Sequence, residues 1–291
     1  MAARSLCLIV NPSAGRGRAA RLLPRVEAAL HARGLAFHVE RTDSLPHART
    51  LARAALEAGE VAAAMGGDGL LGAVAAELRG TAGVLGVLPG GRGNDFARKL
   101  GIGGDPERAC DVLATGQERR IDVADAGGVT YLGIASAGFD SDVQVLANAT
   151  RVPLGGLVYG YATLRALRGW RHACWDVVVD GEARTFSGYS VAVANSGVFG
   201  GGMRLVPGAR LDDGLLDVVL AREWPKRRFL LNLPRVFRGS HTGSENLVFL
   251  RGREISFGAD RPFAAYADGD PVADLPVTIR VVPGALKVLV P

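Results

Sequence analysis

The chain has 291 residues, of which 48% are hydrophobic and 22% are charged, a balance that excludes a largely disordered protein and suffices for one large or two medium domains. The net charge of +5 fits an anionic ligand or a negatively charged membrane face, and it is too small to indicate nucleic-acid binding. The three cysteines are scattered and form no Cys-x-x-Cys pair, which argues against a disulfide framework and a zinc site. No apolar stretch reaches the roughly 20 residues needed to span a membrane. We therefore expect a cytoplasmic protein, and peripheral contact with the inner membrane face stays open.

Short apolar runs alternate with helical patterns through the first part of the chain. We predict strands at 6–10, 37–41, 61–65 and 84–88, and helices at 18–32, 45–57, 70–78 and 95–100. Strict alternation of strand and helix favours a parallel sheet that helices cover on both faces. In such sheets, ligands bind beyond the carboxyl ends of the strands.

The pattern changes after Ile121. Short valine-rich runs, separated by Gly, Asp and Pro, lie at 175–179, 189–194, 215–220 and 277–282, with one helical stretch at 159–167. Such runs are typical of an antiparallel, β-rich domain. We therefore expect an α/β domain at 1–125 and a β-rich domain at 126–291, and the last strand is free to return to the first domain.

Three glycine-rich loops each follow a predicted strand, at 11–18, 66–69 and 89–95. Glycine lets backbone N–H groups approach a ligand closely, and the helix after each loop directs its positive end to the same place. Three such loops on adjacent strands predict one anion-binding rim. Tight turns without a ligand are the competing interpretation.

The first loop also allows a different interpretation. Gly15-Arg-Gly-Arg-Ala-Ala20 matches the dinucleotide fingerprint G-x-G-x-x-A, and Glu40 ends the next strand, where a ribose-binding acid is expected. An NAD-dependent oxidoreductase would leave the other two loops unexplained, and Asn11-Pro-Ser-Ala14 separates the strand from the first glycine. No loop ends in Gly-Lys-Ser/Thr, so a Walker P-loop is absent.

Together these loops resemble the diacylglycerol kinase catalytic domain, whose family includes sphingosine and ceramide kinases and bacterial lipid kinases. The resemblance spans nearly the whole chain and rests on Asn11-Pro-Ser-Ala-Gly15, Gly66-Gly-Asp-Gly69, Pro89-Gly-Gly-Arg-Gly-Asn-Asp-Phe-Ala-Arg98, Ile121-Asp-Val123, Ser136-Ala-Gly-Phe-Asp140, Leu211-Asp-Asp-Gly-Leu215 and Asp268-Gly-Asp270. It implies a Rossmann-like parallel-sheet domain, like those of phosphofructokinases and NAD kinases, followed by an antiparallel β-sandwich. It also implies an active site in the cleft between them, where the γ-phosphate of ATP passes to a lipid hydroxyl, such as that of diacylglycerol or a sphingoid base.

The resemblance implies that ATP is held mainly through backbone amides. Phosphoryl transfer passes through a loose transition state, so the protein chiefly positions phosphates and neutralises charge. The implied ATP-binding residues are Asn11, Pro12, Ser13, Ala14, Gly15, Thr42, Gly66, Gly67, Asp68, Gly69, Leu70, Leu71, Gly72, Arg92 and Asn94.

Asp68, Asp268 and Asp270 are the implied catalytic groups, and Asp68 and Asp122 are the implied magnesium ligands. Asp68 would reach Mg²⁺ through water, since magnesium takes few carboxylates, and Asp122 is the natural second carboxylate; each could instead cap a turn or a helix. The family's catalytic base, a glutamate, falls at Asp270, whose shorter side chain leaves Asp268 able to share the role. A plain hairpin turn is the competing interpretation of this segment.

A second metal site is implied at the Leu211–Leu215 segment. There Asp213 would bind a structural Mg²⁺ with the carbonyl groups of Arg210 and Leu215. One carboxylate with carbonyl groups and waters is a feasible magnesium site. A hairpin turn explains the same residues without a metal.

Two positions depart from the family pattern. Leu70 and Arg92 stand where many relatives have threonine; a guanidinium at position 92 could pair directly with a phosphate. With the shortened Asp270, these changes keep two alternatives open. One is NAD kinase or another nucleotide-dependent enzyme, and the other is a non-catalytic protein that binds a nucleotide or a lipid.

The expected partner is a lipid with a free hydroxyl, recognised by the small and apolar residues at 196–203. The segment 224–238 mixes bulky apolar and basic residues and could dock on anionic lipid, although a helix packed on the second domain with a solvated basic edge is the preferred interpretation. The sequence leaves open which lipid is used, and also the oligomeric state, with a homodimer as one option.

Overall fold

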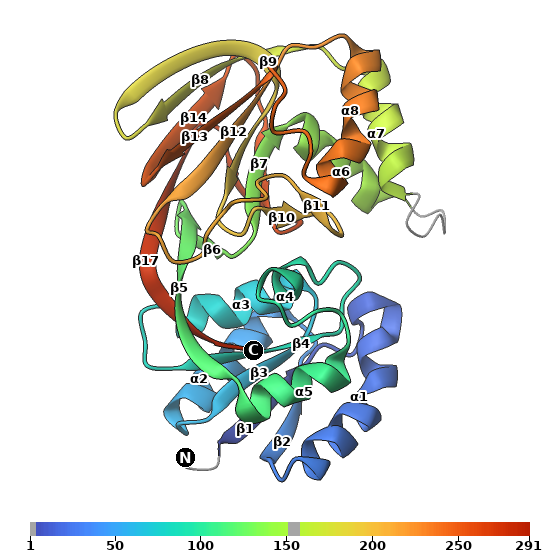
Figure 1. Cartoon of the computed structure of the whole chain (residues 1–291), viewed down its shortest axis with the longest axis vertical. Coiled ribbons are helices and arrows are strands. Elements are labelled where there is room, and N and C mark those ends of the chain that lie inside the picture. Colours follow the sequence, from blue (N-terminus) through green and yellow to red (C-terminus); the bar gives the residue numbers. More distant parts are fainter. Residues whose placement is uncertain (1–3, 151–157) are drawn as a thin grey trace.

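The computed structural model describes residues 4–150 and 158–291. Two parts are stacked along its long axis (Figure 1). The first, mostly blue to green, is a sheet wrapped by helices, and the second, green to red, is mostly sheet with helices on one side. Each part has its own hydrophobic core. Among the described residues, no helix has both the length and the apolar character needed to cross a membrane.

Four parallel strands form the centre of the first part, in the spatial order β2 (Ala36–Arg41), β1 (Ser5–Val10), β3 (Val61–Gly66) and β4 (Val84–Pro89). Five helices follow or connect them: α1 (Ala14–Ala32), α2 (Leu45–Glu57), α3 (Asp68–Leu78), α4 (Asp95–Lys99) and α5 (Pro106–Thr115). β3 is buried along its whole length because helices cover both faces of the sheet. The predicted parallel sheet is confirmed, and α5 is an addition to the prediction.

The second part is built from antiparallel strands, as the sequence predicts. They are β5 (Gln117–Ala126), β6 (Val129–Tyr131), β7 (Ile134–Gly138), β8 (Ala173–Val179), β9 (Glu182–Ala194), β12 (Leu216–Arg222), β13 (Leu247–Gly252), β14 (Glu254–Ala259), β15 (Ala264–Ala267), β16 (Asp270–Asp274) and β17 (Val277–Val290). A separate short hairpin joins β10 (Val198–Phe199) to β11 (Met203–Arg204). The central strand β9 pairs with β7, β8 and β12.

Three helices lie on one side of this second sheet (Figure 1): α6 (Phe139–Ala149), α7 (Val158–Gly169) and α8 (Lys226–Arg238). Aromatic rings fasten them to it, since Phe139 of α6 and Phe229 of α8 meet edge to face, and both contact Tyr189 of β9. The helical prediction at 159–167 is confirmed. The segment at 224–238 also contains the preferred helix, whose basic side chains are exposed.

The last strand, β17, belongs to both parts. It pairs with β14 and β5 in antiparallel fashion, and then its residues Lys287 and Val288 pair in parallel with Val84 and Leu85 of β4. The sheet is therefore continuous, with 15 strands. This continuity fixes the first part's loops against the second part's hairpins.

Candidate active site

The three glycine-rich loops meet at the carboxyl ends of β1, β3 and β4. The amides of Gly90 and Gly91 both donate to the carbonyl oxygen of Gly66, at 2.9 and 2.8 Å. A β-carbon on Gly91 would lie 2.5 Å from the Cα of Gly67, and one on Gly15 would lie 2.8 Å from the carbonyl oxygen of Gly90. Only glycine permits backbones to approach this closely, so the loops form one contiguous surface.

The first loop is braced by Asn11. The side-chain oxygen of Asn11 accepts hydrogen bonds from the amide (3.0 Å) and the hydroxyl (2.7 Å) of Ser13. The amide of Ala14, after Pro12, donates to the Asn11 carbonyl oxygen at 3.1 Å. From Gly15 onward, three consecutive residues have positive φ angles of 60°, 59° and 81°, which interrupt the first turn of α1. The backbone amides of Ser13 and Ala14 therefore already donate hydrogen bonds within the loop, both to Asn11.

The second loop leads directly into α3. Gly67 is the N-cap residue, and no side chain caps the helix there. The first N–H groups of a helix have no partner within it and attract anions. Leu70 and Leu71 are buried, the Leu70 side chain lies against Gly66 of the loop, and Gly72 continues the helix. The departure at Leu70 thus alters packing under the loop.

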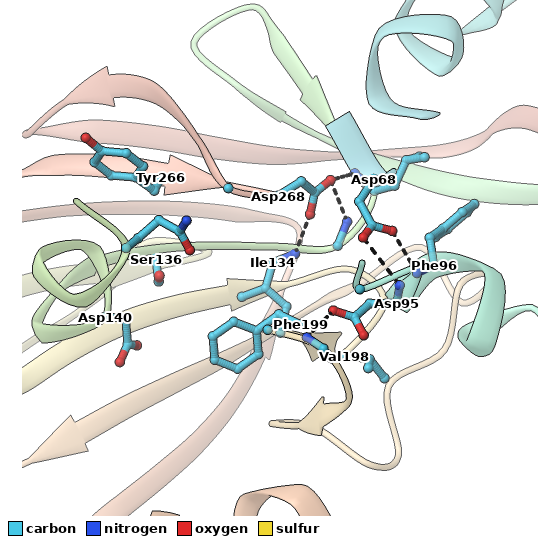
Figure 2. A pocket seen from close by; sticks show the side chains of 17 residues that line it. Asp68, Asp95, Phe96, Ile134, Ser136, Asp140, Val198, Phe199, Tyr266 and Asp268 are labelled. Carbon is cyan, nitrogen blue, oxygen red and sulfur yellow. Dashed lines mark hydrogen bonds between the residues drawn. The ribbon is translucent and has the colours of Figure 1, made fainter. Parts of the chain in front are cut away.

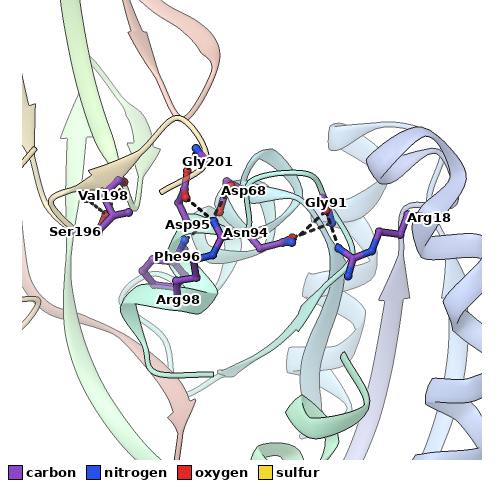
Figure 3. Close-up of polar contacts among 10 residues, drawn as sticks. All are labelled: Arg18, Asp68, Gly91, Asn94, Asp95, Phe96, Arg98, Ser196, Val198 and Gly201. Carbon is purple, nitrogen blue, oxygen red and sulfur yellow. Dashed lines mark hydrogen bonds and ion pairs between the residues drawn. The ribbon is translucent and has the colours of Figure 1, made fainter. Parts of the chain in front are cut away.

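The third loop is closed by Asn94 (Figure 3). Asn94 is buried with φ 51°; its side-chain oxygen accepts from the Gly91 amide at 2.8 Å, and its side-chain nitrogen donates to the Gly91 carbonyl oxygen at 3.1 Å. Arg18 of α1 donates to the same carbonyl oxygen at 3.1 Å. Asn94 therefore holds the loop's shape, and Arg92 is exposed on it.

Thr42 lies just after β2, beside the end of β1. Its amide donates to the carbonyl oxygen of Val10 at 2.8 Å, and its hydroxyl donates to the carbonyl oxygen of Ser44 at 2.7 Å. The residue is buried. Its hydroxyl is thus used by the local turn that precedes α2.

An acidic cavity lies between the two parts of the molecule (Figure 2). Asp68 and Asp95 line it from the first part, and the second part contributes Ser136 of β7, Tyr266 of β15 and Asp268. The predicted acceptor region also reaches it through the β10–β11 hairpin, since Phe199, Gly200 and Gly201 belong to its wall. The cleft that the resemblance implies is therefore present.

Asp68 connects the second loop with the third (Figures 2 and 3). Its carboxylate accepts hydrogen bonds from the amides of Phe96 at 3.2 Å and Asp95 at 3.4 Å, so it caps the first turn of α4. The Asp95 side chain accepts from the Gly201 amide at 2.8 Å and from Arg98 at 3.1 Å. Burial, and then the negative charge of Asp68, raise the pKa of Asp95.

Asp268 occupies the turn of the β15–β16 hairpin, with φ 51°, so the predicted hairpin is present. Its carboxylate accepts hydrogen bonds from three successive amides, those of Leu132 (2.9 Å), Gly133 (3.1 Å) and Ile134 (3.2 Å). Burial, assisted by the nearby charge of Asp68, raises the pKa of Asp268 to about 6. The side chain thus anchors the hairpin to the segment that enters β7.

Asp270 begins β16 and reaches across the cleft. Its Oδ2 atom lies 3.3 Å from the position that a β-carbon on Gly69 would take, in the first turn of α3. Burial raises the pKa of this carboxyl group. One carboxylate of the second part therefore lies against the helix end that the glycine loops surround.

Asp122 does not join this group. It is buried within β5, and its two carboxylate oxygens accept hydrogen bonds from the amides of Gly214 (2.7 Å) and Gly284 (2.8 Å). These bonds tie two turns together away from the cavity. Asp95, which sequence reasoning missed although it follows Asn94 in the quoted motif, lines the cavity together with Asp68.

Asp68 and Asp95 suit a hydrated Mg²⁺ ion. Burial raises the pKa values of Asp95 and Asp268, and the negative charge of Asp68 raises them further, so a cation beside these carboxylates would be favourable. Magnesium binds through one or two carboxylates with several waters. Among the described residues, the compact metal-ligand cluster consists of Cys7, His38 and Glu60; Glu60 precedes β3, so this cluster lies away from the glycine loops.

The implied structural magnesium site does not fit its residues. The guanidinium of Arg251 pairs with the Asp213 carboxylate and, at 3.1 Å, with Asp217. The amide of Leu215 donates to the other Asp213 oxygen at 3.2 Å, while Arg210 pairs with Asp212. Arg251 therefore already supplies a positive charge beside Asp213, at the place where the implied cation would lie.

An apolar cavity adjoins the acidic one and shares Asp140, Gln144, Phe199 and Gly200 with it. Its walls come from α6, α7, α8, β9 and β12, and include Phe139, Val143, Trp224, Phe229, Leu233 and Val236. Asp140 stands where the two cavities meet; burial raises its pKa to about 6, although a hydrogen bond from Ser190 opposes the change. An acidic chamber therefore opens into an apolar one.

Comparisons with known proteins agree with this two-part architecture. Residues 5–126 match the family model of the diacylglycerol kinase catalytic domain, and residues 133–290 match that of the YegS C-terminal NAD kinase beta sandwich-like domain. The diacylglycerol kinase of Mycobacterium tuberculosis is 32% identical over 97% of this chain and 94% of its own length. A "probable lipid kinase YegS-like" protein of Chromohalobacter salexigens is 30% identical over 83% of this chain and 79% of its own. The crystal structure of a diacylglycerol kinase from Bacillus anthracis superimposes with a TM-score of 0.78 at 20% identity, covering 100% of this chain and 98% of that one.

Proposed function

The chain belongs to the diacylglycerol kinase family of lipid kinases, and from that premise we propose that it transfers the γ-phosphate of ATP to the hydroxyl of a lipid held between its two parts. One observation carries the proposal. The carboxylate of Asp270, from the second part, lies against Gly69 in the first turn of α3. A base for the acceptor and an anion site for the donor are thus side by side.

We place the triphosphate on the glycine loops and the first turn of α3. The N-terminal amides of α3 have no side-chain cap, and the helix dipole favours negative charge there. Asp68 and Asp95 would hold Mg²⁺ with waters in between. When bound, Mg²⁺ neutralises the charge on the transferred phosphoryl group. Thr42 and Asn94 shape the surrounding loops, and their side chains are engaged within them.

We assign the acceptor's proton to Asp270. Burial raises its pKa, and a base works best when its pKa approaches the working pH. Asp268 is a positioning residue, because three amide hydrogen bonds fix its carboxylate and hold the hairpin that presents Asp270. The shorter side chain at position 270 still reaches the first turn of α3, because its carboxylate lies against Gly69, which has no side chain.

The lipid acceptor would place its hydroxyl in the acidic cavity and its hydrocarbon chains in the apolar one. The two cavities share Asp140 and Phe199, so a polar head and an apolar tail can be bound together. Diacylglycerol is the first acceptor to test, because the mycobacterial relative is named diacylglycerol kinase. A sphingoid base has the same division into a hydroxyl head and an apolar chain.

Radiolabelled ATP, Mg²⁺ and either diacylglycerol, sphingosine or a lipid extract of the host provide the test. Wild-type protein is expected to give a labelled product in the organic phase, and Asp270→Asn is expected to reduce it by about 100-fold or more. Labelled NADP from added NAD would indicate an NAD kinase instead. Nucleotide binding without any labelled product would indicate a non-catalytic relative.

A further inference from the structure

Three side chains of metal-ligating types meet on the sheet of the first part, outside the proposed kinase site. Cys7 of β1, His38 of β2 and Glu60, which immediately precedes β3, each offer one ligand atom, and these atoms lie within 4.8 Å of one another. Cys7 and His38 are each the third residue of a six-residue strand. The cluster therefore lies toward the amino ends of the strands, whereas the glycine loops follow their carboxyl ends.

The pairing of parallel strands brings the cluster together. Cys7 is the direct partner of His38 in the register of β1 with β2, and β1 also pairs with β3. The hydroxyl of Ser5, two residues before Cys7, donates to Oε1 of Glu60 at 2.8 Å. The spacing of the cysteines argues against a zinc site, but spacing cannot show that a histidine and a glutamate from other segments join one of them.

The side chains point to the same face of the sheet. The ring of Phe37 contacts His31 of α1, with ring centroids 4.7 Å apart. Successive side chains of a strand alternate between faces, so His38 points to the opposite face. β2 is the edge strand of the sheet (Figure 1), and the His38 side chain is 49% exposed, whereas Cys7 is buried. A metal ion can therefore enter from solvent beside His38.

The distances are close to those of tetrahedral zinc coordination. Bonds of about 2.0–2.3 Å from Zn²⁺ to nitrogen, oxygen and sulfur separate neighbouring ligand atoms by about 3.3–3.6 Å. Nδ1 of His38 lies 3.7 Å from Oε1 of Glu60, so small side-chain adjustments complete the geometry. An ion pair between His38 and Glu60 is the competing interpretation, and it makes no use of Cys7.

The surroundings of Cys7 favour a cation. Burial, and then the negative charges of Glu60 and Glu40, raise the pKa of the Cys7 thiol to about 11. Glu40 follows His38 by two residues on β2 and so points to the same face. Two carboxylates thus act on the sulfur atom, and a divalent cation beside it would offset their charge.

We propose that Cys7, His38 and Glu60 bind a divalent transition-metal ion of the zinc class, with water in the fourth position. Sulfur and imidazole nitrogen suit Zn²⁺, whereas Mg²⁺ takes oxygen ligands. The sulfur atom donates an electron pair to the metal, and the thiol proton leaves to solvent. Ser5 is a positioning residue, because its hydroxyl orients the Glu60 carboxylate. The ion would join β2 to β1 and to the start of β3, independently of the proposed kinase function.

A zinc competition titration tests the site. The full-length, metal-free protein competes with a chromophoric chelator for Zn²⁺, and excess Mg²⁺ fills sites built from oxygen alone. Wild type is expected to bind a single Zn²⁺ ion. His38→Ala should lower the affinity by about 100-fold or more and Ser5→Ala by about tenfold, since the outer partners of a metal contribute about 10- to 100-fold. The exposure of His38 makes His38→Ala a variant that should keep its fold.

Cobalt spectroscopy identifies the sulfur ligand. Wild-type protein loaded with Co²⁺ should show an intense near-ultraviolet band from charge transfer between thiolate and metal, because the thiolate is the form of cysteine that binds metals. Cys7→Ser should remove this band. If Cys7→Ser does not fold, the zinc affinity of His38→Ala still decides the proposal.

Two matched controls should bind Zn²⁺ like wild type. Cys174→Ser combined with His47→Ala replaces an exposed cysteine and an exposed histidine outside the cluster, and Asp68→Asn alters the proposed magnesium site. Unchanged affinity in His38→Ala, a cobalt complex without the thiolate band, or equal loss in either control would overturn the proposal. If wild type phosphorylates no lipid, the proposed function fails while the zinc titration still decides this site.

Discussion

The Asp270 carboxylate lies 3.3 Å from the position that a β-carbon on Gly69 would occupy, although these residues come from different parts of the molecule. An added methyl group at position 69 would have to displace the carboxylate by a few tenths of an ångström. The proximity therefore makes Gly69 a sensitive position for the proposed base.

Gly69→Ala is expected to lower kcat about tenfold, because small displacements of a catalytic group are costly, while the melting temperature changes little. Gly243→Ala, at an exposed glycine with open space around it, is the matched control and should retain full activity. Steady-state kinetics with ATP and the lipid acceptor measure both. Full activity of Gly69→Ala would argue against Asp270 as the base.

Asp268 and Asp270 are expected to respond differently to replacement by asparagine. Asp268→Asn should lower the free energy of unfolding by about 2–4 kcal/mol, because an asparagine side chain cannot accept from all three amides. Asp270→Asn should leave that free energy within about 0.5 kcal/mol of wild type and remove most of the activity. Denaturant unfolding and kinase assays on both variants check the pair; a stable but inactive Asp268→Asn would reverse the two roles.

The glycine loops and the Asp268–Asp270 hairpin could be predicted because their signals are local. Glycines after strands and a short Asp-Gly-Asp turn are visible within a few residues of sequence. Helix α5 also had a local signal, since Asp105 and Pro106 stand at its N-terminus, but the prediction passed over it.

The contacts of Asp122 and Asp213 could not be predicted in the same way. Asp122 bonds to Gly284, and Arg251 reaches Asp213, so each contact depends on how distant strands pair. A carboxylate beside a turn looks the same in sequence whether an amide, a guanidinium or a metal ion faces it. Only the tertiary arrangement separates Asp95, in the cavity, from Asp122, outside it.

Asp68→Asn should raise the Mg²⁺ concentration needed for half-maximal activity and lower kcat by about 100-fold or more. The fold should survive, because asparagine keeps one oxygen to cap α4, and a weakened cap costs about 1 kcal/mol. A Mg²⁺ titration of activity and a thermal melt measure the two effects. An unchanged Mg²⁺ dependence would remove Asp68 from the proposed metal site.

The partly buried Asp140 carboxyl group predicts a pH effect on stability. Its pKa rises from 3.8 to about 6 on folding, so the folded state holds the proton more tightly. The stability that this group contributes is complete below pH 4 and is lost as the pH rises through 6. At about 1.4 kcal/mol per pKa unit, the loss is at most about 3 kcal/mol.

Asp140→Asn has no such proton to lose. Its stability relative to wild type should therefore increase between pH 4 and pH 6.5 and stay level above that range. Denaturant unfolding at pH 4, 5, 6 and 7.5 measures the difference. A constant difference across these values would show that the folded-state pKa of Asp140 is not raised.

Arg251 pairs with Asp213 and Asp217. From these ion pairs we predict that the folded protein needs no structural cation at this turn. Without nucleotide or zinc, EDTA and added Mg²⁺ should leave the wild-type melting temperature unchanged. Arg251→Met would leave two neighbouring carboxylates unpaired and should cost about 1–2 kcal/mol, a modest value because the arginine is partly exposed. Added Mg²⁺ should recover part of that loss, since a divalent cation could then replace the guanidinium charge. A zinc-free wild-type protein that EDTA destabilises would contradict this account and return the turn at Asp213 to the role of a metal site.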